Sequence, residues 1–570
     1  MMTPPLMLLT LVCTCIPTSA QRQVSSVVPT KLGSVQGQLE QVRTQRGQVV
    51  EVDVFWSIPY AAPPVGELRF KRPVAAAPWD GVLDVSRMPE SCYQVYTKDP
   101  IYAPNPSTNA SEDCLYLSIW RPRCHPRADP DTAGTREPGE ELATMVWIHG
   151  GGYMTGSVTT SWYNGAVLAA TECVIVAAMN YRLGALGFLF LDIPDVPGNM
   201  GLLDMTLATT WIKENIASFG GDPARITIFG HSAGAASTSL FLLSPLTRNL
   251  FNNAIIQSGS PISHVARQSR QSGIEAAREF ARRLNCFSES NQEICSCLME
   301  ADAGHLAQVQ FELSQDYRFI MTAVVDQYFL LEDSITLLRN GDFKRCDLLL
   351  GSALDEGTYF MGLKWPNTYN FHSEETVRIC EKELDDKLTQ FFSDFLKQEY
   401  IAQVIREVKA LYDLDSLSTE VEDASLKLLG QVIGDVINTC PVRQMAGFYS
   451  NSSQSAYVYS YEHGHDNPTV ARWTGAIHGA DLQFVFGWPT VDLVAFTQRE
   501  AELSGAMMGY WANFAKYGHP SGHSLPLWLK YNRKYSGHVL RFSSSTAILN
   551  DVTDEKLCDY WQNLPRHYLN

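Results

Sequence analysis

The stretch from Ile226 to Gly234 reads ITIFGHSAG, in which an apolar, β-branched run is followed by small residues. The run Ile226 to Phe229 is typical of a buried strand, and the residues from Ala233 onward are typical of a helix. A serine hydroxyl becomes a good nucleophile when it is exposed, lies at a helix N-terminus and is hydrogen-bonded to a base. A sharp strand-to-helix turn between glycines provides the first two conditions, so Ser232 is the candidate nucleophile; the alternative is a glycine-rich packing turn.

A second glycine-rich motif precedes this turn. His149-Gly150-Gly151-Gly152 directly follows the apolar run Thr144 to Ile148, which is a predicted strand. Acyl transfer develops negative charge on a carbonyl oxygen, and consecutive glycines let backbone N–H groups approach that oxygen closely. The alternative is a flexible loop. Because both motifs follow strands and occur in this order, the sequence favours a serine-dependent acyl-transfer site.

Short apolar runs alternate with helical patterns along most of the chain. Parallel sheets covered by helices on both faces have this signature, so the fold class is α/β, with a large, mostly parallel sheet flanked by helices. Residues 265–320 and 373–440 are predicted to be mainly helical and to cover one end of the sheet. The predicted strands are Thr144 to Ile148, Val174 to Met179, Ile226 to Phe229, Asn253 to Gln257, Asp347 to Gly351, Tyr457 to Tyr461 and His538 to Phe542, and the clearest helices are Leu203 to Ile216 and Ala501 to Tyr517.

The acid and the base of such a site follow the serine along the chain in this architecture. Asp355-Glu356-Gly357 comes just after a predicted strand, where a carboxylate would stand at the carboxyl end of the sheet; a solvated loop acid would have the same pattern. His478 lies among small, loop-like residues and is modestly favoured as the base. The other histidines beyond residue 400 stay open at this point: His463, His465, His519, His523, His538 and His567.

One segment could suggest a metal site. Residues 463–466 read HGHD, with two histidines that are two positions apart. That spacing on a turn is more typical of a solvated loop than of a ligand set, so no metal is predicted.

Composition and charge restrict the partners. The chain has 570 residues, of which 45% are hydrophobic and 18% are charged, and its net charge is −17. A negative field disfavours nucleic acid and anionic lipid surfaces and suits a neutral or cationic small molecule. No repeat or long linker divides the chain, and the polar stretch 121–141 is typical of a surface insertion. We therefore expect residues 21–570 to form a single domain.

The N-terminus has the pattern of a secretory signal peptide over residues 1–20. The apolar run Leu6 to Ile16 is too short to span a bilayer, and small residues precede a cut after Ala20. No later run is long and apolar enough for a membrane span, so a soluble, secreted protein is expected. Glycosylation sequons at Asn109 and Asn451 agree with this route. Thirteen cysteines also fit an oxidising compartment; two lie in the leader, and the odd number that remains leaves at least one thiol unpaired.

Further segments match a known family, in order and over nearly the whole chain. The sequence resembles the type-B carboxylesterase/cholinesterase family, which has the α/β-hydrolase fold. The resemblance implies Ser232 as nucleophile, Glu356 as triad acid and His478 as general base. It also implies an oxyanion hole made by the N–H groups of Gly151, Gly152 and Ala233, and no metal or organic cofactor. The matching segments are SIPYA at 57–61, PPVG at 63–66, SEDCLYL at 111–117, NYR at 180–182, FGGDP at 219–223 and QSGS at 257–260.

The resemblance also implies three disulfides and leaves the remaining cysteines open. The implied pairs are Cys92 with Cys114, Cys286 with Cys297, and Cys440 with Cys558. The third closes the longest loop, where a cross-link is expected to stabilise most. No family partner is assigned to Cys124, Cys173, Cys295, Cys346 or Cys380.

Within the family, the substrate class depends on a few positions. Cholinesterases hold a quaternary ammonium over a tryptophan, and here Pro104 takes that place; His231 replaces their glutamate before the nucleophile. Other residues point toward a cholinesterase, although core packing would explain them equally well. These are Tyr317 and Phe319, at the position of an acyl-pocket pair, and Tyr359 and Phe360, at the position of an aromatic pair beside the choline site. Asp481 takes the place of a supporting family glutamate.

These observations predict a secreted serine carboxylic ester hydrolase that works through an acyl-enzyme and acts on a small-molecule ester. One alternative is a cholinesterase that binds its cation through other aromatic residues. Another is a non-catalytic binding or adhesion homologue, which the presence of Ser232 and the lack of a predicted span disfavour. A homodimer through helices near Ala501 to Tyr517 and the C-terminus is expected from the family alone, and the natural ester stays open.

Overall fold

The computed structural model describes most of the chain. The predicted leader, Pro104 and the predicted pocket residues Tyr317 and Phe319 lie outside the described residues. The described ranges are 23–96, 105–124, 141–314, 321–373, 378–413, 424–452, 454–466, 470–522, 525–532, 537–543, 547–551 and 554–569.

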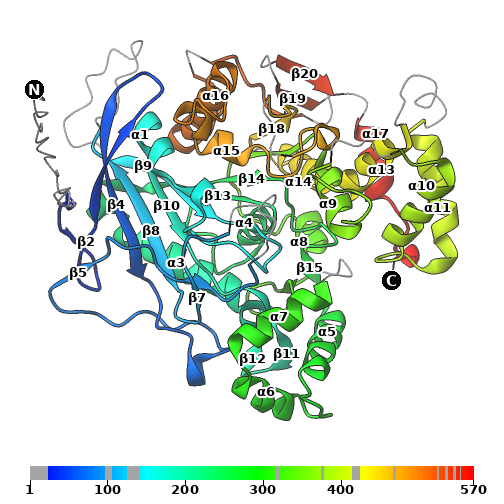
Figure 1. Ribbon diagram of the computed structural model, residues 1–570, viewed down its shortest axis with the longest axis horizontal. Coiled ribbons are helices and arrows are strands. Elements are labelled where there is room, and N and C mark those ends of the chain that lie inside the picture. Colours follow the sequence, from blue (N-terminus) through cyan, green and yellow to red (C-terminus); the bar gives the residue numbers. More distant parts are fainter. Residues whose placement is uncertain are drawn as a thin grey trace, which may run out of the picture.

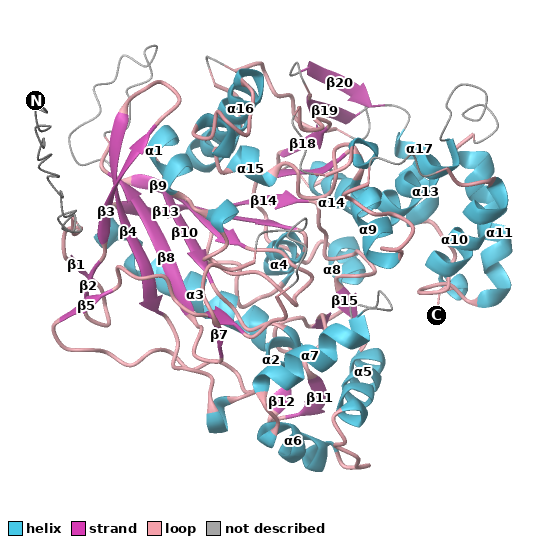
Figure 2. Ribbon diagram, in the orientation of Figure 1, coloured by secondary structure: helices cyan, strands magenta, loops and turns pink. Residues whose placement is uncertain are grey.

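An eleven-stranded sheet forms the centre of the molecule, in the order β20-β19-β18-β17-β14-β13-β9-β10-β8-β4-β3. Neighbouring strands from β10 to β19 run parallel, whereas the pairs at both edges are antiparallel. The predicted α/β class is confirmed, and Figure 2 shows the strands crossing the molecule between helices. The strands are β3 (Gln38–Arg43), β4 (Val49–Pro59), β8 (Tyr116–Pro122), β9 (Leu142–Ile148), β10 (Ile175–Met179), β13 (Gly221–His231), β14 (Asn253–Gln257), β17 (Leu348–Ala353), β18 (Ala456–Tyr461), β19 (Gly537–Phe542) and β20 (Ala547–Asp551).

Helices cover both faces of this sheet. Alternate residues of β9 show the two faces: Val146 and Ile148 pack into one core with α3 and α4, while Met145 and Trp147 pack into another with α1 and α16. This alternation follows from the period-two geometry of a strand. The helices are α1 (Ala166–Glu172), α2 (Gly184–Phe188), α3 (Met200–Asn215), α4 (Ala233–Leu243), α5 (Arg270–Arg283), α6 (Asn291–Glu300), α7 (Ala303–Ser314), α8 (Ser334–Asn340), α9 (Glu356–Lys364), α10 (Glu381–Phe392), α11 (Gln398–Leu411), α13 (Ala424–Gly434), α14 (Cys440–Ser450), α15 (Leu482–Val485), α16 (Gln498–Tyr517) and α17 (Asp554–Gln562).

A third core joins α9, α10, α11 and α13 into a helical cluster, against which α17 also packs. In Figure 1, α10 and α11 lie at the end of the molecule opposite strands β2 (Ser34–Gln36) and β5 (Val82–Asp84). Between α13 and α14 the chain forms a π-helical turn, Asp435–Thr439 (η5). Among the described residues, no helix combines the length and apolar character that crossing a membrane requires.

Short strands complete the fold outside the large sheet. They form one three-stranded sheet and three two-stranded ones. The strands not yet given are β1 (Val28–Pro29), β6 (Ser91–Cys92), β7 (Ala110–Ser111), β11 (Phe190–Ile193), β12 (Val196–Pro197), β15 (Arg267–Gln268) and β16 (Ala323–Val324).

Within the described part of the chain, four disulfides cross-link the fold. Three are the pairs implied by the resemblance: Cys92–Cys114, Cys286–Cys297 and Cys440–Cys558. The fourth joins Cys124 to Cys173, two residues for which the sequence suggested no partner. Of the remaining described cysteines, Cys295 and Cys346 are buried free thiols and Cys380 is an exposed one.

Candidate active site

Ser232 lies at the turn between β13, which ends at His231, and α4, which begins at Ala233. Its backbone has φ 57° and ψ −123°, a conformation that favours glycine and costs other residues about 1–3 kcal/mol. The Ser232 N–H donates to the Gln257 carbonyl at 2.9 Å, which fixes the turn against the neighbouring strand β14. The turn therefore places the serine at the carboxyl end of the sheet, where the motif predicted it.

Glycines on both sides of the serine allow the close packing that this turn needs. A Cβ atom on Gly230 would lie 2.5 Å from the Gly234 carbonyl oxygen, and one on Gly234 would lie 2.0 Å from the Ile148 carbonyl oxygen. Real Cβ atoms do not approach backbone oxygens so closely. The two glycines therefore bring the turn directly against the end of β9.

The HGGG segment follows β9 and lies next to the serine turn. A Cβ atom on Gly150 would be 3.1 Å from the Ser232 Cβ, and Gly151 and Gly152 have φ values of 112° and 61°, which suit glycine. In the described structure, the N–H groups of Gly151 and Gly152 donate to no other residue. The N–H of Ala233 belongs to the first turn of α4, where N–H groups have no intrahelical acceptor. These N–H groups are free to bind a negatively charged oxygen.

Glu356 and His478 form a buried pair. The Nδ1–H of His478 donates to Glu356 Oε2 at 2.5 Å, and the two side chains are 5% and 0% exposed. Glu356 is the first residue of α9, separated by two residues from the end of β17, and its Oε1 accepts from the Ala353 N–H at 2.8 Å. Because Nδ1 donates to the carboxylate, Nε2 is the nitrogen left to take a proton from a nucleophile.

The local charges fix the ionisation of Glu356. Burial by itself raises the pKa of this carboxyl, but the charge of His478 and the polar side chains of His478, Ser258 and Asn438 outweigh it and lower the pKa below its usual value. The residue therefore stays an anion beside the imidazole. It can hold the ring in place and stabilise it when it becomes positively charged.

One cavity extends from the serine to side chains that contact this pair. It is lined by Gly152, Ser232 and Ala233, and also by Phe360 and Asn438, which both contact His478. Within the described residues, the Ser232 hydroxyl makes no hydrogen bond. Catalytic contacts of this kind commonly tighten only when a substrate is bound.

Aromatic rings surround the imidazole. The ring of His231 lies 4.4 Å from that of His478, and the rings of Tyr359 and Phe360 lie 5.0 Å and 5.2 Å from it. Burial, together with the charge of His478, lowers the pKa of His231 well below its usual value, so this side chain is neutral. Of the predicted pocket residues, Phe360 lines the cavity, whereas His231 and Tyr359 contact His478.

Asp481 lies on the loop that carries His478 and supports it through buried hydrogen bonds. Its Oδ2 accepts from the Gln257 side-chain amide at 3.0 Å and from the Tyr459 hydroxyl at 2.9 Å, and it is fully buried. Burial raises the pKa of this carboxyl. Asp481 therefore ties the loop that carries His478 to strands β14 and β18.

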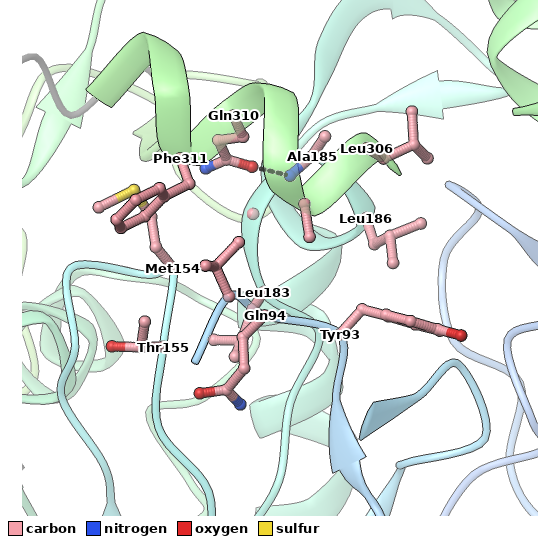
Figure 3. A pocket seen from close by; sticks show the side chains of 13 residues that line it. Tyr93, Gln94, Met154, Thr155, Leu183, Ala185, Leu186, Leu306, Gln310 and Phe311 are labelled. Carbon is pink, nitrogen blue, oxygen red and sulfur yellow. Dashed lines mark hydrogen bonds between the residues drawn. The ribbon is translucent and has the colours of Figure 1, made fainter. Parts of the chain in front are cut away.

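A side-chain amide holds the loop that follows the HGGG segment. Gln94 pairs with Gly156 twice: its amide donates to the Gly156 carbonyl and accepts from the Gly156 N–H, both at 2.9 Å. Beyond it lies a second cavity, shown in Figure 3, between Met154 and helix α7. There Gln310 accepts from the Ala185 N–H at 2.6 Å, so the cavity wall is tied to the turn at the start of α2.

The segment that could have suggested a metal site has a structural role. His463, Asp466 and Glu500 bring ligand atoms within 4.8 Å of one another. However, both oxygens of Glu500 already accept hydrogen bonds: Oε1 from His463 and the Asp466 N–H, and Oε2 from the N–H of Thr497. Thr497 and Glu500 form a capping box at the start of α16. These hydrogen bonds join residues 463–466 to the start of that helix.

Sequence reasoning missed one residue of the site. The Asn438 side chain donates to Glu356 Oε2 at 2.8 Å and is 4% exposed. It lies on the π-helical turn, two residues before Cys440, where the sequence has no motif. The only signal was the predicted helical character of residues 373–440, which does not indicate where a side chain points.

Comparisons with known proteins agree with this geometry. The model of the carboxylesterase family matches residues 24–561. A cholinesterase of Mus musculus is 35% identical over 525 residues, which cover 90% of this chain and 83% of that protein. An acetylcholinesterase of Bungarus fasciatus is 32% identical and covers 99% of this chain and 90% of its own length. Acetylcholinesterase 1 of Caenorhabditis elegans is 35% identical, with 92% and 86% covered.

Proposed function

The chain belongs to the carboxylesterase family and is a serine carboxylic ester hydrolase, and on this basis we propose that it is secreted and acts through an acyl-enzyme on Ser232. The observation that carries the proposal is the buried hydrogen bond from His478 to Glu356 beside the cavity that Ser232 lines. This arrangement supplies a nucleophile, a base and an anion that orients the base.

The first half-reaction forms the acyl-enzyme. His478 Nε2 takes the proton of the Ser232 hydroxyl while Oγ attacks the ester carbonyl carbon. The N–H groups of Gly151, Gly152 and Ala233 bind the negatively charged oxygen of the tetrahedral intermediate. The bond to the alcohol oxygen then breaks, the alcohol leaves with the proton from His478, and the acyl group stays on Ser232.

The second half-reaction repeats this sequence with water. His478 takes a proton from water as the water oxygen attacks the acyl carbonyl, and the intermediate collapses to release the carboxylic acid. Ser232 recovers its proton from the imidazole. Glu356 stays ionised throughout and stabilises the imidazolium in both halves.

The test of this mechanism is a Ser232→Ala protein assayed with p-nitrophenyl acetate. We expect the variant to lose hydrolysis and to lose labelling by an organophosphate, whereas the wild-type protein gains one adduct on the peptide that contains Ser232. A folded variant that hydrolyses the ester at the wild-type rate would contradict the proposal. Absence of labelling in the wild-type protein would favour the non-catalytic alternative.

Secretion is supported by the leader pattern and by four disulfides, which persist in oxidising compartments. The sequon residues Asn109 and Asn451 are both exposed. We expect the protein to be recovered from the culture medium with an N-terminus at Gln21, and to lose mass on treatment with an N-glycosidase. The homodimer expected from the family is tested by light scattering of the same material.

A choline ester is the second candidate substrate. Three similar proteins are cholinesterases by name, Tyr359 and Phe360 flank His478, and the net charge is −17. Against it, a neutral His231 precedes the nucleophile and supplies no negative charge. Hydrolysis of acetylthiocholine, butyrylthiocholine and uncharged esters of matched acyl length separates the two. Selectivity that follows the ammonium group would establish the second candidate.

A further inference from the structure

The residue that carries this inference is Asn438. Its side-chain Nδ2 donates to Glu356 Oε2 at 2.8 Å and lies 3.3 Å from His478 Nδ1. The same carboxylate oxygen thus accepts from the amide and from the imidazole, while Oε1 accepts from the Ala353 N–H. With the amide oxygen in place of the nitrogen, two negative groups would face each other, so the nitrogen is the atom that faces Glu356.

The backbone places Asn438 there through close helix packing. A Cβ atom on Gly357 would lie 1.8 Å from the Gly430 carbonyl oxygen and 2.7 Å from the Gly434 nitrogen. Helices α9 and α13 therefore touch backbone to backbone at the first turn of α9, which begins at Glu356. The π-helical turn follows Gly434 at once, and its extra residue changes the face on which Asn438 lies.

The π-helical turn is fixed on several sides. The Ser263 hydroxyl donates to the Ile437 carbonyl at 2.6 Å, and the Tyr412 hydroxyl donates to Asp435 Oδ2 at 2.8 Å. Cys440, the next residue after the turn, forms the disulfide with Cys558 of α17. Asn438 is thus held by a rigid support, and π-helical turns are frequent at functional sites.

We propose that Asn438 is a positioning residue, which holds the Glu356 carboxylate in the orientation that receives His478. This inference rests on the proposed function. Three donors fix both oxygens of Glu356, so the carboxylate does not rotate when the imidazole gains or loses its second proton.

Other titratable groups also lie around Glu356 and His478. None of them hydrogen-bonds to Glu356 Oε2 in the described structure, where Asn438 and His478 are the donors. Substitution of Asn438 therefore changes one donor and leaves these groups in place. They are Asp355 beside Glu356, His231 on β13, Asp481 on the loop of His478 and Tyr459 on β18.

Two isosteric substitutions and one control test the proposal. Asn438→Leu removes the donor, and Asn438→Asp replaces it with a group that donates only when protonated. The control is Asp435→Asn. Asp435 lies on the same π-helical turn, but its side chain hydrogen-bonds to Tyr412 and not to Glu356. All three are measured as the full chain for kcat, KM, the pH profile of kcat/KM with p-nitrophenyl acetate, and the melting temperature.

For Asn438→Leu we expect kcat to fall roughly tenfold, with KM within about twofold, because a charge-assisted hydrogen bond is lost. The acidic limb of the kcat/KM profile should move to higher pH, because the lost hydrogen bond is one of the contacts that lower the pKa of Glu356. Asn438→Asp should lose more activity at neutral pH and recover part of it as the pH falls and the new carboxyl becomes protonated. The control should keep the wild-type profile, even if its melting temperature falls.

A folded Asn438→Leu protein with wild-type kcat and an unmoved acidic limb would overturn the inference. If that variant does not fold, Asn438→Asp decides, because it preserves the shape of the side chain: a loss of activity that does not respond to pH would also overturn it. Failure of the proposed function has a different signature, namely hydrolysis that survives Ser232→Ala.

Discussion

The substitution Glu356→Gln tests the charge of the buried pair most directly, because it keeps the size of the side chain. Glu356 accepts from His478 Nδ1 at 2.5 Å, from Asn438 at 2.8 Å and from the Ala353 N–H at 2.8 Å. A glutamine has one acceptor oxygen, so at least one of these donors must face its NH₂ group. The substitution therefore removes the counter-charge of the imidazolium and leaves a buried donor without a partner.

The size of the effect follows from the geometry. Two opposite unit charges about 4 Å apart attract each other by about 4 kcal/mol at an effective dielectric constant of about 20. Because roughly 1.4 kcal/mol corresponds to a factor of ten in rate, kcat should fall about a thousandfold. The unpaired donor should lower the free energy of unfolding by about 1–3 kcal/mol. KM should change little, since Glu356 faces the imidazole and not the substrate.

The assay is steady-state hydrolysis of p-nitrophenyl acetate, with urea unfolding of the same samples. Glu172→Gln is the matched control, because Glu172 is a carboxylate on α1 whose partner is Lys516 and which lies outside the site. We expect near wild-type activity from the control. A folded Glu356→Gln enzyme that keeps kcat within tenfold of the wild type would refute the role given to this charge.

Three further predictions follow from other features. Replacing Cys440 and Cys558 by alanine opens a loop with a sequence separation of 118 residues, and urea unfolding should show a loss of about 5 kcal/mol. Gly234→Ala should give insoluble or inactive protein, because the new methyl group would lie 2.0 Å from the Ile148 carbonyl oxygen; soluble enzyme with wild-type kcat would contradict the packing. His231 is buried, and its pKa is well below the ordinary value of 6.5. As the pH falls, the unfolded chain therefore binds a proton at this residue at a higher pH than the folded chain does. The free energy of unfolding should fall as the pH drops below 6.5. A His231→Gln protein should show a shallower fall in unfolding free energy between about pH 6.5 and 5.

The catalytic motifs and the parallel strands could be predicted because they are local. The turn around Ser232 and the glycines at 150–152 are short patterns whose geometry depends on adjacent residues, and the strand predicted at Asn253 to Gln257 has those bounds in the structure. The edge strands β3, β4 and β8 were not predicted. They contain polar residues and pair antiparallel at the edge of the sheet, so their sequence lacks the continuous apolar run of a central strand.

Features that depend on distant parts of the chain could not be predicted. Asn438 reaches Glu356 only because glycines on two helices meet and a π-helical turn redirects the chain, and neither event has a sequence pattern. The Cys124–Cys173 disulfide likewise depends on how the chain enters and leaves the sheet. The position of His231 was visible in the motif, but its contact with the ring of His478 was not.

The backbone of Ser232 has a consequence beyond catalysis. Its φ and ψ suit glycine, so any other residue there destabilises the folded state. An inactive Ser232→Gly protein should therefore tolerate heat better than the working enzyme. At this position, selection for thermal endurance and selection for ester turnover oppose each other. A search for stabilising variants that does not also score activity would favour loss of the nucleophile.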